Sequence, residues 1–377
     1  MRKGMSTGKL GFGLMRLPER DGEIDAEAVF EMVDAFLAKG FTYFDTAYVY
    51  HGGKSERMVK DAIVDRHPRA SFTIATKLPA WALKTREDVQ RVFNEQLERT
   101  GARYFDYYLL HSIEEAHLKN YDRFGCWEWA QDMKKKGLIR HFGFSFHDSP
   151  ELLDRVLTEH PEVEFVQLQI NYADWDNKIV QSRANYEVAL KHKKPIIIME
   201  PVKGGMLASM TPESEKVLKE RLPAASPASW ALRFCASLEG VLTVLSGMTT
   251  AAQVADNLNT MTGFKPLNGD ETRCLEKAKE ILLSAPTIPC TGCRYCEDGC
   301  PQGIRISDLF RALNTVKTYG EGDKRPFFFY GGVTLNGTTG TASSCVQCGD
   351  CESVCPQHLP IREHLAETAG VFDKKGE

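Results

Sequence analysis

The sequence predicts an α/β fold, in which a closed (β/α)8 barrel of the TIM type is followed by a small, mostly helical domain. From residue 24 onward, short β-rich runs alternate with amphipathic stretches of helical period, which is the pattern of a parallel sheet covered by helices. About eight such strands in roughly 260 residues favour a closed barrel over an open sheet. Beyond residue 285 the chain changes character, because eight of its eleven cysteines lie there.

Seven apolar runs are predicted to be barrel strands, and an eighth run is a weaker candidate. The runs are 41–45, 72–77, 104–111, 139–145, 164–170, 195–201 and 241–247, with 261–264 as the weak eighth. The leading segment, residues 9–17, is expected to form a short hairpin that plugs the barrel floor.

Helical stretches with start and stop signals separate these runs. Residues 26–39 and 127–136 are each followed by a glycine, and Thr85 with Asp88 predicts a capping box for a helix that ends before Gly101. Residues 268–284 form a last helix, and Pro286 and Pro289 mark a linker. We therefore expect a barrel domain over residues 1–284 and a second domain over residues 285–377.

Composition and charge exclude several classes of protein. A hydrophobic content of 42% suits a globular protein with an ample core, and a net charge of −4 gives no footprint for nucleic acid. The polar, glycine-rich start is unlike a signal peptide, and no apolar run reaches 18 residues. We expect a cytoplasmic protein that binds neither nucleic acid nor membrane.

The eight cysteines of the tail form two copies of one pattern, Cys-x2-Cys-x2-Cys-x3-Cys-Pro, 55 residues apart. They are Cys290, Cys293, Cys296 and Cys300, then Cys345, Cys348, Cys351 and Cys355. This run is typical of 4Fe–4S clusters in two-cluster ferredoxins, where the fourth Cys ligates the cluster of the other motif. We therefore expect cluster A on Cys290, Cys293, Cys296 and Cys355, and cluster B on Cys345, Cys348, Cys351 and Cys300.

Zinc is the alternative occupant, since thiolate quartets also bind Zn²⁺, but zinc leaves the third Cys of each run and the trailing Pro unexplained. Both motifs lead into helical segments, predicted at 307–316 and 361–368. The tail is thus predicted to be a ferredoxin-like domain with a pseudo-twofold repeat. The aromatic run 327–330 is expected to cover a cluster from water, or else to form a docking patch for an electron-transfer partner.

Polar or titratable residues stand at the C-terminal ends of seven consecutive predicted strands. They are Asp45, Lys77, His111, Ser145, Gln167 or Gln169, Glu200 and Ser246. Each has an ordinary explanation when taken singly, such as a turn cap for Asp45 or a solvated charge for Lys77. Working residues of a parallel barrel lie at these strand ends, so the joint pattern predicts a site at that face.

Three segments resemble the active-site segments of the aldo-keto reductase family, namely FDTAYVYHGGKSE (44–56), ATK (75–77) and DYYLLH (106–111). The resemblance covers residues 10 to about 265 and implies a catalytic tetrad of Asp45, Tyr50, Lys77 and His111. Tyr50 would be the proton donor, Lys77 would favour its phenolate, Asp45 would hold Lys77 charged, and His111 would orient the substrate oxygen. Tyr48 is expected to pack rather than react.

The resemblance also implies NADH or NADPH bound without a Gly-x-Gly-x-x-Gly loop, which the sequence lacks. The implied cofactor contacts are Ser145 and Gln167 on the carboxamide, Glu200 near the nicotinamide, Val202 and Gly204 at the pyrophosphate, and Ser246, Gln253, Asp256 and Asn257 at the adenosine end. The sequence departs from the family pattern at Phe146, where the family usually has Asn, and at Met199 and Glu200, where it usually has a stacking Tyr. Residues 246–257 contain no Lys or Arg for a 2′-phosphate, which favours NADH.

The leading prediction is an NAD(P)-dependent oxidoreductase that interconverts a small-molecule carbonyl and alcohol, with a redox partner protein or a ferredoxin as its macromolecular partner. One alternative is an electron-transfer subunit whose barrel is a scaffold for a partner or a flavin. A structural role for the clusters, stapling the tail to the barrel, is a third. The complete tetrad favours the enzyme. A flavin would normally connect a two-electron hydride donor to one-electron clusters, and no flavin motif is present.

Overall fold

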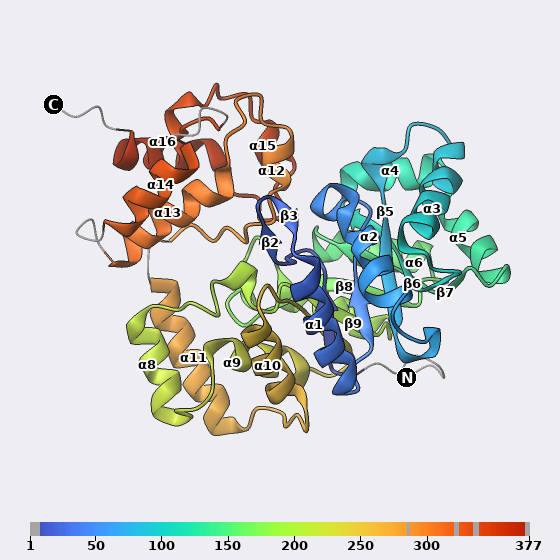
Figure 1. Ribbon diagram of the computed structural model, residues 1–377, viewed down its shortest axis with the longest axis horizontal. Coiled ribbons are helices and arrows are strands. Elements are labelled where there is room, and N and C mark those ends of the chain that lie inside the picture. The colour runs from blue at the N-terminus through green and yellow to red at the C-terminus, as the bar shows by residue number, and fades with distance from the viewer. Residues whose placement is uncertain (1–7, 285–286, 320–323, 335–338, 374–377) are drawn as a thin grey trace. The chain divides into compact units, whose positions relative to one another are not determined.

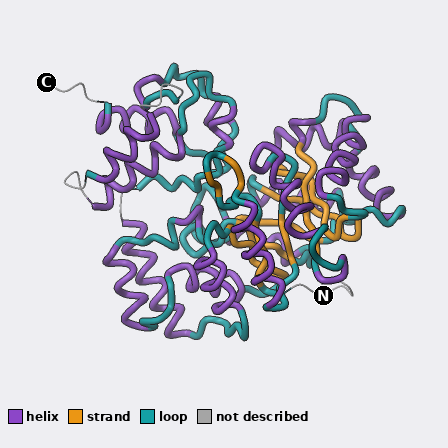
Figure 2. The backbone as a smooth tube through the Cα atoms, in the orientation of Figure 1, coloured by secondary structure: helices purple, strands orange, loops and turns teal. Residues whose placement is uncertain are grey.

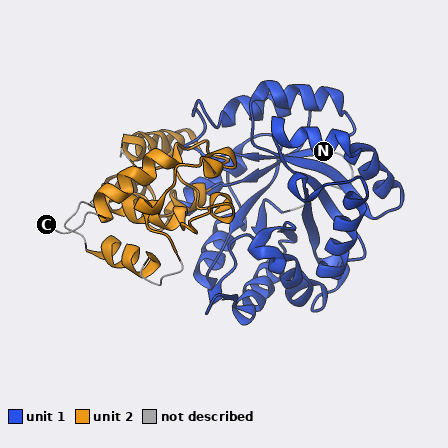
Figure 3. Cartoon of the chain, turned by 90° about the horizontal axis from the view of Figure 1, so that it is seen from above, with its two compact units in different colours: residues 1–201, 228–267 blue, residues 202–227, 268–377 orange. Residues whose placement is uncertain are grey.

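The computed structural model describes residues 8–284, 287–319, 324–334 and 339–373. Figures 1 and 2 show its helices, strands and loops. Contacts divide the chain into two compact units, residues 1–201 with 228–267 and residues 202–227 with 268–377 (Figure 3). Pro286 of the predicted linker lies outside the described residues. Among the described residues, no helix combines the length and the apolar content that crossing a membrane requires.

The first unit is built on a closed barrel of parallel strands, as predicted. The strands are β1 (Leu10–Gly13), β4 (Tyr43–Asp45), β5 (Thr73–Pro79), β6 (Phe105–Ile113), β7 (Ile139–Phe146), β8 (Phe165–Gln169), β9 (Ile196–Met199) and β10 (Val241–Gly247). Neighbours along the chain are neighbours around the barrel from β4 to β10, and β1 closes the ring between β10 and β4.

Helices follow most of the strands and surround the barrel (Figure 1). They are α1 (Ala26–Ala38), α2 (Lys54–Val59), α3 (Glu87–Thr100), α4 (Glu115–Arg123), α5 (Cys126–Lys135), α6 (Pro150–Glu159), α7 (Ser182–Lys191), α9 (Pro227–Ser237) and α10 (Ala251–Met261). The predicted capping box of α3 is half formed, because Asp88 accepts from the backbone N–H of Thr85 at 2.8 Å while no side chain caps the helix start.

Two predictions about the barrel strands were wrong. The leading segment is not a plug, because Leu10–Gly13 is itself a barrel strand that pairs in parallel with both β10 and β4. Its Leu10 and Phe12 side chains are fully buried. A short hairpin follows it, formed by β2 (Glu19–Arg20) and β3 (Glu23–Ile24). Residues 261–264 are not a strand, because Met261 ends α10 and Gly263 adopts a left-handed turn.

The barrel interior is filled by side chains and is not a pore. Tyr43, Tyr107 and Phe165 pack inside it with ring centroids 5.0 and 5.3 Å apart, together with aliphatic residues of other strands. A larger apolar core lies between the strands and the surrounding helices. A filled interior leaves the strand ends as the place where a ligand can bind.

The second unit combines a barrel-domain segment with the cysteine-rich tail. Its helices are α8 (Pro212–Arg221), α11 (Gly269–Ser284), α12 (Tyr295–Asp298), α13 (Ile306–Tyr319), α14 (Arg325–Thr334), α15 (Asp350–Ser353) and α16 (Ile361–Phe372). Helices α8 and α11 pack together, and the Ser214 hydroxyl donates to the carbonyl of Ala278 at 2.6 Å. The helices predicted after each cysteine motif are present as α13 and α16.

Candidate active site and cluster motifs

Lys77 is the centre of a buried polar cluster at the C-terminal ends of β4 and β5. Its Nζ donates to Asp45 Oδ1 at 2.5 Å, to the carbonyl of Thr46 at 2.8 Å and to Tyr50 Oη at 3.3 Å. The register pairs Asp45 with Ala75, so the strands themselves set this proximity. The side chains of Lys77 and Asp45 are both almost fully buried. Three donated bonds use all three hydrogens of an ammonium group, so the geometry fits a charged lysine.

Tyr50 and His111 complete the cluster. Tyr50 begins a single helical turn, Tyr50–Gly53, directly after the β4 loop, and the next residues His51 and Gly52 have φ of 51° and 62°. The rings of Tyr50 and His111 meet edge to face with centroids 6.0 Å apart. Lys77 Nζ also lies 4.8 Å from the centroid of the Tyr50 ring. The structure therefore brings the four residues of the predicted tetrad together.

Burial sets the direction of the pKa shifts in this cluster. It raises the pKa of the Asp45 carboxyl and lowers the pKa of the Lys77 ammonium, while the attraction between the two groups opposes both shifts. Burial, followed by the charge of Lys77, holds the pKa of His111 well below its usual range. His111 is therefore a neutral imidazole near pH 7, which can still donate one N–H hydrogen bond.

A second buried carboxylate, Glu56 on α2, stands behind the cluster and was missed by the sequence reasoning. Its side chain is fully buried and accepts from Thr76 Oγ1 at 2.7 Å and from Gln96 Nε2 at 2.8 Å, with Arg99 Nη1 at 3.4 Å. Gln96 also donates to the carbonyl of Lys77 at 3.0 Å. The negative charge of Glu56 opposes the lowering of the Lys77 pKa. Glu56 thus helps to hold Lys77 in its charged form.

The two residues predicted to grip the carboxamide lie beside the tetrad. Ser145 and Gln167 are register partners on β7 and β8, and both are buried. Gln167 Nε2 donates to Asp45 Oδ2 at 3.1 Å, and Ser145 Oγ accepts from the backbone N–H of Ser112, next to His111, at 2.8 Å. The structure therefore links both residues to the predicted tetrad.

Glu200, directly after β9, has a left-handed backbone with φ of 55°. Its carboxylate lies 3.5 Å from the guanidinium of Arg16, and its carbonyl accepts from Asn171 Nδ2 at 3.1 Å. Arg16 also packs against the C-terminal end of β10, because a Cβ atom on Gly247, the last residue of that strand, would lie 3.1 Å from its side chain. Sequence reasoning missed Arg16, a cation that the fold brings to the strand ends of β9 and β10.

The residues predicted at the adenosine end lie together where β10 passes into α10. Asn257 Nδ2 donates to Ser246 Oγ at 2.8 Å, and Gln253 forms a capping box with Thr250 at the start of α10. Asp256 lies on the same helix. The remaining two predicted contacts, Val202 and Gly204, belong to the second unit, where Gly204 lies against Thr291 of the first cysteine motif.

Two other aromatic residues near the tetrad differ in environment. Trp81 is 44% exposed, and its ring lies 5.2 Å from that of His111 and 5.0 Å from that of His117. Tyr48 donates to Glu95 Oε2 at 2.7 Å, and the Arg99 guanidinium stacks over its ring. Tyr48 therefore packs away from the tetrad, as expected.

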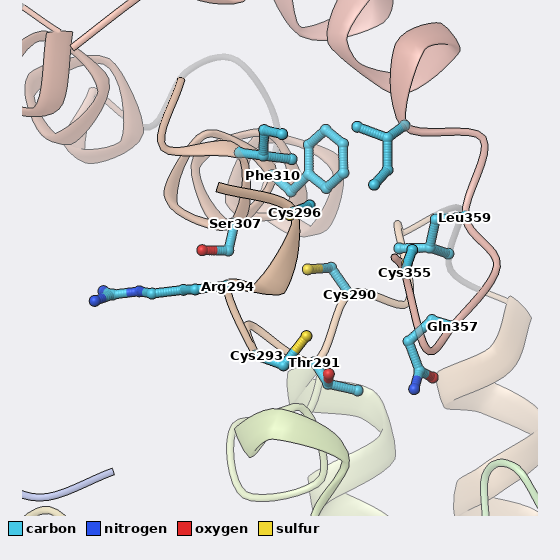
Figure 4. Close-up of a pocket in the computed structure, with 12 residues that line it drawn as sticks. Cys290, Thr291, Cys293, Arg294, Cys296, Ser307, Phe310, Cys355, Gln357 and Leu359 are labelled. Atoms are coloured by element: carbon cyan, nitrogen blue, oxygen red, sulfur yellow. The ribbon is translucent and has the colours of Figure 1, made fainter. Parts of the chain in front are cut away.

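Three cysteines of the first motif and the last cysteine of the second line one cavity. They are Cys290, Cys293, Cys296 and Cys355 (Figure 4). Phe310, Leu359 and Ile361 form part of its apolar wall. Burial, and then the charges of the neighbouring thiols, raise the pKa of Cys296. Four thiolates in such a site repel one another unless cations balance them, so the donor set fits a bound 4Fe–4S cluster.

The second motif is more open. Cys351 is buried, and burial followed by the charges of Glu352, Cys345 and Cys348 raises its pKa to about 11. Cys348 is exposed. Helices α12 and α15, one in each motif, pack together. Over the described ranges, no three His, Cys, Asp or Glu side chains are arranged to hold a single metal ion.

The internal repeat predicted from the sequence is visible in how α13 and α16 begin. Glu297 accepts from the backbone N–H of Ser307 at 2.9 Å, and Glu352, 55 residues later, accepts from that of Arg362 at 2.9 Å. Of the aromatic run 327–330, which lies on α14, Tyr330 stacks on Phe372 with centroids 4.5 Å apart, whereas Phe328 is 78% exposed. The role of the aromatic run 327–330 in covering a cluster stays a prediction.

Comparison with known proteins identifies the family. Residues 9–280 match the model of the aldo/keto reductase family. The chain belongs to this family. Residues 289–359 match the model of a 4Fe-4S dicluster domain. The protein is therefore an oxidoreductase of the aldo/keto reductase family that carries an iron–sulfur domain.

Individual relatives are distant. The chain is 25% identical over 301 residues to L-galactose dehydrogenase of Arabidopsis thaliana, covering 74% of this chain and 92% of the relative. It is 20% identical over 305 residues to an uncharacterized oxidoreductase of Bacillus subtilis, covering 72% and 92%. Among solved structures, a thermostable aldo-keto reductase bound to epalrestat aligns with a TM-score of 0.60 at 22% identity, covering 74% and 97%. An aldo/keto reductase of Klebsiella pneumoniae bound to NADP and acetate aligns with 0.59 at 19%, covering 71% and 90%.

Proposed function

We propose that the protein reduces a small-molecule carbonyl to an alcohol, and catalyses the reverse oxidation, with a nicotinamide nucleotide as the hydride carrier. The observation that carries this proposal is the contact of Lys77 with both Asp45 and the Tyr50 hydroxyl. The bound nucleotide would supply or accept the hydride. That the relatives include an aldo/keto reductase solved with NADP supports the choice of carrier.

The chain's own residues would manage the proton and the developing charge. Reduction leaves negative charge on the substrate oxygen, and the Tyr50 hydroxyl would give that oxygen its proton. The Lys77 ammonium, 3.3 Å away, stabilises the phenolate that remains, and Asp45 holds Lys77 in place. His111, neutral because of its lowered pKa, would donate a hydrogen bond to the substrate oxygen. In oxidation, the Tyr50 phenolate would act as the base.

Ser145 and Gln167 would hold the nicotinamide carboxamide, since both lie beside the tetrad and carry hydrogen-bonding groups. Glu200, Ser246, Gln253, Asp256 and Asn257 would contact the rest of the nucleotide. NADH is expected to bind at least as well as NADPH, because residues 246–257 contain no Lys or Arg. The nearby guanidinium of Arg16 faces Glu200.

The tail would hold two 4Fe–4S clusters with crossed ligation. Cluster A would take Cys290, Cys293, Cys296 and Cys355, which line one cavity, and cluster B would take Cys345, Cys348, Cys351 and Cys300. The clusters would exchange single electrons with a redox partner protein or a ferredoxin. This chemistry fits the reducing cytoplasm that the sequence predicts.

Replacing Tyr50 by Phe tests the proposed role of the hydroxyl, with Tyr48→Phe as the matched control two residues away. The probe reaction is reduction of 4-nitrobenzaldehyde by NADH and by NADPH. Tyr50→Phe is expected to lose about 10²–10⁴ in rate while nucleotide binding, followed by fluorescence, stays near that of the wild type. Tyr48→Phe is expected to keep its activity, because that hydroxyl bonds to Glu95. Full activity in Tyr50→Phe would refute the assignment.

A further inference from the structure

The segment after β9 is held in an unusual backbone conformation. Glu200, Lys203, Gly204 and Gly205 have φ of 55°, 48°, 65° and 101°. Two of these four are not glycine, and a left-handed backbone costs a side-chain-bearing residue of order 1 kcal/mol or more. Such strain persists only where the surroundings impose it. The contacts of this segment therefore identify what imposes it.

Gly204 lies against the backbone of the first cysteine motif. A Cβ atom at this position would lie 2.1 Å from the carbonyl oxygen of Thr291 and 2.4 Å from its Cα. Thr291 stands between Cys290 and Cys293 and lines the cavity with them (Figure 4). Only glycine allows this approach. The backbone of residues 202–205, here called the β9 loop, is thus in direct contact with the loop that would carry two ligands of cluster A.

The residues that follow the β9 loop strengthen this attachment. Residues 202–227 belong by their contacts to the same compact unit as the cysteine-rich tail (Figure 3). Helix α8 packs on α11, where Ser214 bonds to Ala278. Lys203, in the β9 loop itself, is buried. The loop that the sequence assigns to the nucleotide is therefore built into the unit that holds the cysteines.

The other end of this short segment is fixed at the barrel. The carbonyl of Glu200 accepts from Asn171, and its carboxylate faces Arg16. Only Pro201, Val202 and Lys203 separate Glu200 from Gly204. These three residues offer few soft dihedral angles, and the φ angle of Pro201 is fixed by its ring, so the stretch can absorb little of a displacement at either end.

We propose that the β9 loop couples the nucleotide site to cluster A. Nucleotide binding then changes the environment of cluster A, and cluster A in turn changes the affinity for the nucleotide. The proposal rests on the proposed function, since it assumes that residues 202–205 contact the nucleotide pyrophosphate. A nucleotide that fixes the β9 loop must also act on Thr291 and the Cys290–Cys293 turn. By linkage, the factor by which a bound nucleotide changes the stability of cluster A equals the factor by which cluster A changes the affinity for the nucleotide.

The first test uses the wild-type protein with both clusters, reduced by dithionite under anaerobic conditions. Adding excess NADH or NADPH cannot oxidise the clusters, because both nucleotides are already reduced. We expect the electron paramagnetic resonance signal of cluster A to change in shape when the nucleotide binds, with a midpoint equal to the dissociation constant measured by fluorescence. The Cys355→Ser variant assigns the signal, since it should perturb cluster A. Nucleotide binding that leaves both cluster signals unchanged overturns the coupling and leaves the proposed function standing.

The second test is a pair of glycine variants in the same loop. Gly204→Ala places a methyl group against Thr291, whereas Gly205→Ala meets no atom within 4 Å. Both glycines have positive φ, so the pair separates contact with the motif from backbone strain. Gly204→Ala is expected to alter the cluster A signal and to weaken nucleotide binding about tenfold, within the usual range of such couplings. In Gly205→Ala, the cluster A signal is expected to stay that of the wild type.

The outcomes distinguish two kinds of failure. A wild-type cluster A signal in Gly204→Ala overturns the coupling. If the wild-type protein binds neither nucleotide, the proposed function fails and the coupling fails with it. If Gly204→Ala does not fold, the wild-type titration still decides, because it needs no substitution.

Discussion

Replacing Glu56 by Gln removes one negative charge from behind Lys77 while keeping the shape of the side chain. The amide oxygen can still accept from Thr76 and Gln96, which now bond to Glu56 at 2.7 and 2.8 Å. The amide nitrogen replaces the oxygen that faces Arg99 at 3.4 Å. Two donors then face each other in a buried site. Losing a buried hydrogen-bond partner of this kind lowers the free energy of unfolding by about 1–3 kcal/mol. For a barrel of this size, that corresponds to a fall in Tm of roughly 2–10 °C.

The same substitution is expected to change the pH dependence of catalysis. The charge of Glu56 raises the pKa of Lys77, against the larger lowering caused by burial. Without that charge, the pKa of Lys77 falls further. Since the charged lysine is the active form, activity is lost at a lower pH, and the basic limb of the pH profile moves toward lower pH.

The assay is the rate of carbonyl reduction from pH 6 to pH 10, combined with thermal unfolding of the same samples. Glu95→Gln is the matched control, because Glu95 also faces Arg99, at 3.6 Å, but its side chain is 33% exposed. It should leave both the pH profile and, within about 0.5 kcal/mol, the stability unchanged. If the Glu56→Gln protein folds and the basic limb of its pH profile does not move, then Glu56 does not set the charge of Lys77.

Three further predictions follow from the cysteine motifs, the nucleotide loop and the barrel. Cys355→Ser should perturb cluster A despite its place in the second motif, and loss of cluster B alone, followed by iron content and paramagnetic resonance, would show that ligation is not crossed. NADH should bind at least as tightly as NADPH in a fluorescence titration; tenfold tighter NADPH binding, about 1.4 kcal/mol, would mean that Arg16, Lys203 or Lys265 supplies a cation for the 2′-phosphate. Gly143→Ala should lower Tm markedly, because its Cβ would lie 2.4 Å from the carbonyl oxygen of Phe165; an unchanged Tm would contradict the tight strand packing.

The sequence was sufficient to predict the barrel, because the barrel depends on local patterns, and the resemblance of three segments to the family named four residues that the structure brings together. Apolar runs and helical periods predicted seven of the strands, and the tetrad residues follow from segments that the fold places at strand ends. The strand Leu10–Gly13 was missed because four residues with two glycines carry too little apolar pattern. It is a strand because it pairs with both β4 and β10, which only the closed barrel provides.

What the sequence could not predict depends on tertiary contacts. A single glutamate in a helix, such as Glu56, normally lies in solvent, and its burial follows from the packing of α2 beside β5 and α3. Arg16 is near the end of β10 only because β1 pairs with that strand and closes the ring. The attachment of residues 202–227 to the tail unit likewise joins segments that are far apart in the sequence.

The exposure of Cys348 has a consequence for handling the protein. Its sulfur is open to solvent, whereas Cys296 of the first motif is buried. Dissolved oxygen and chelators reach an open ligand first, and thiolate oxidation follows accessibility. A cluster held by the second motif should therefore be lost before its neighbour when the protein is exposed to air. Preparations purified aerobically would then contain about half the iron expected for two clusters, even though every cysteine of both motifs is present in the chain.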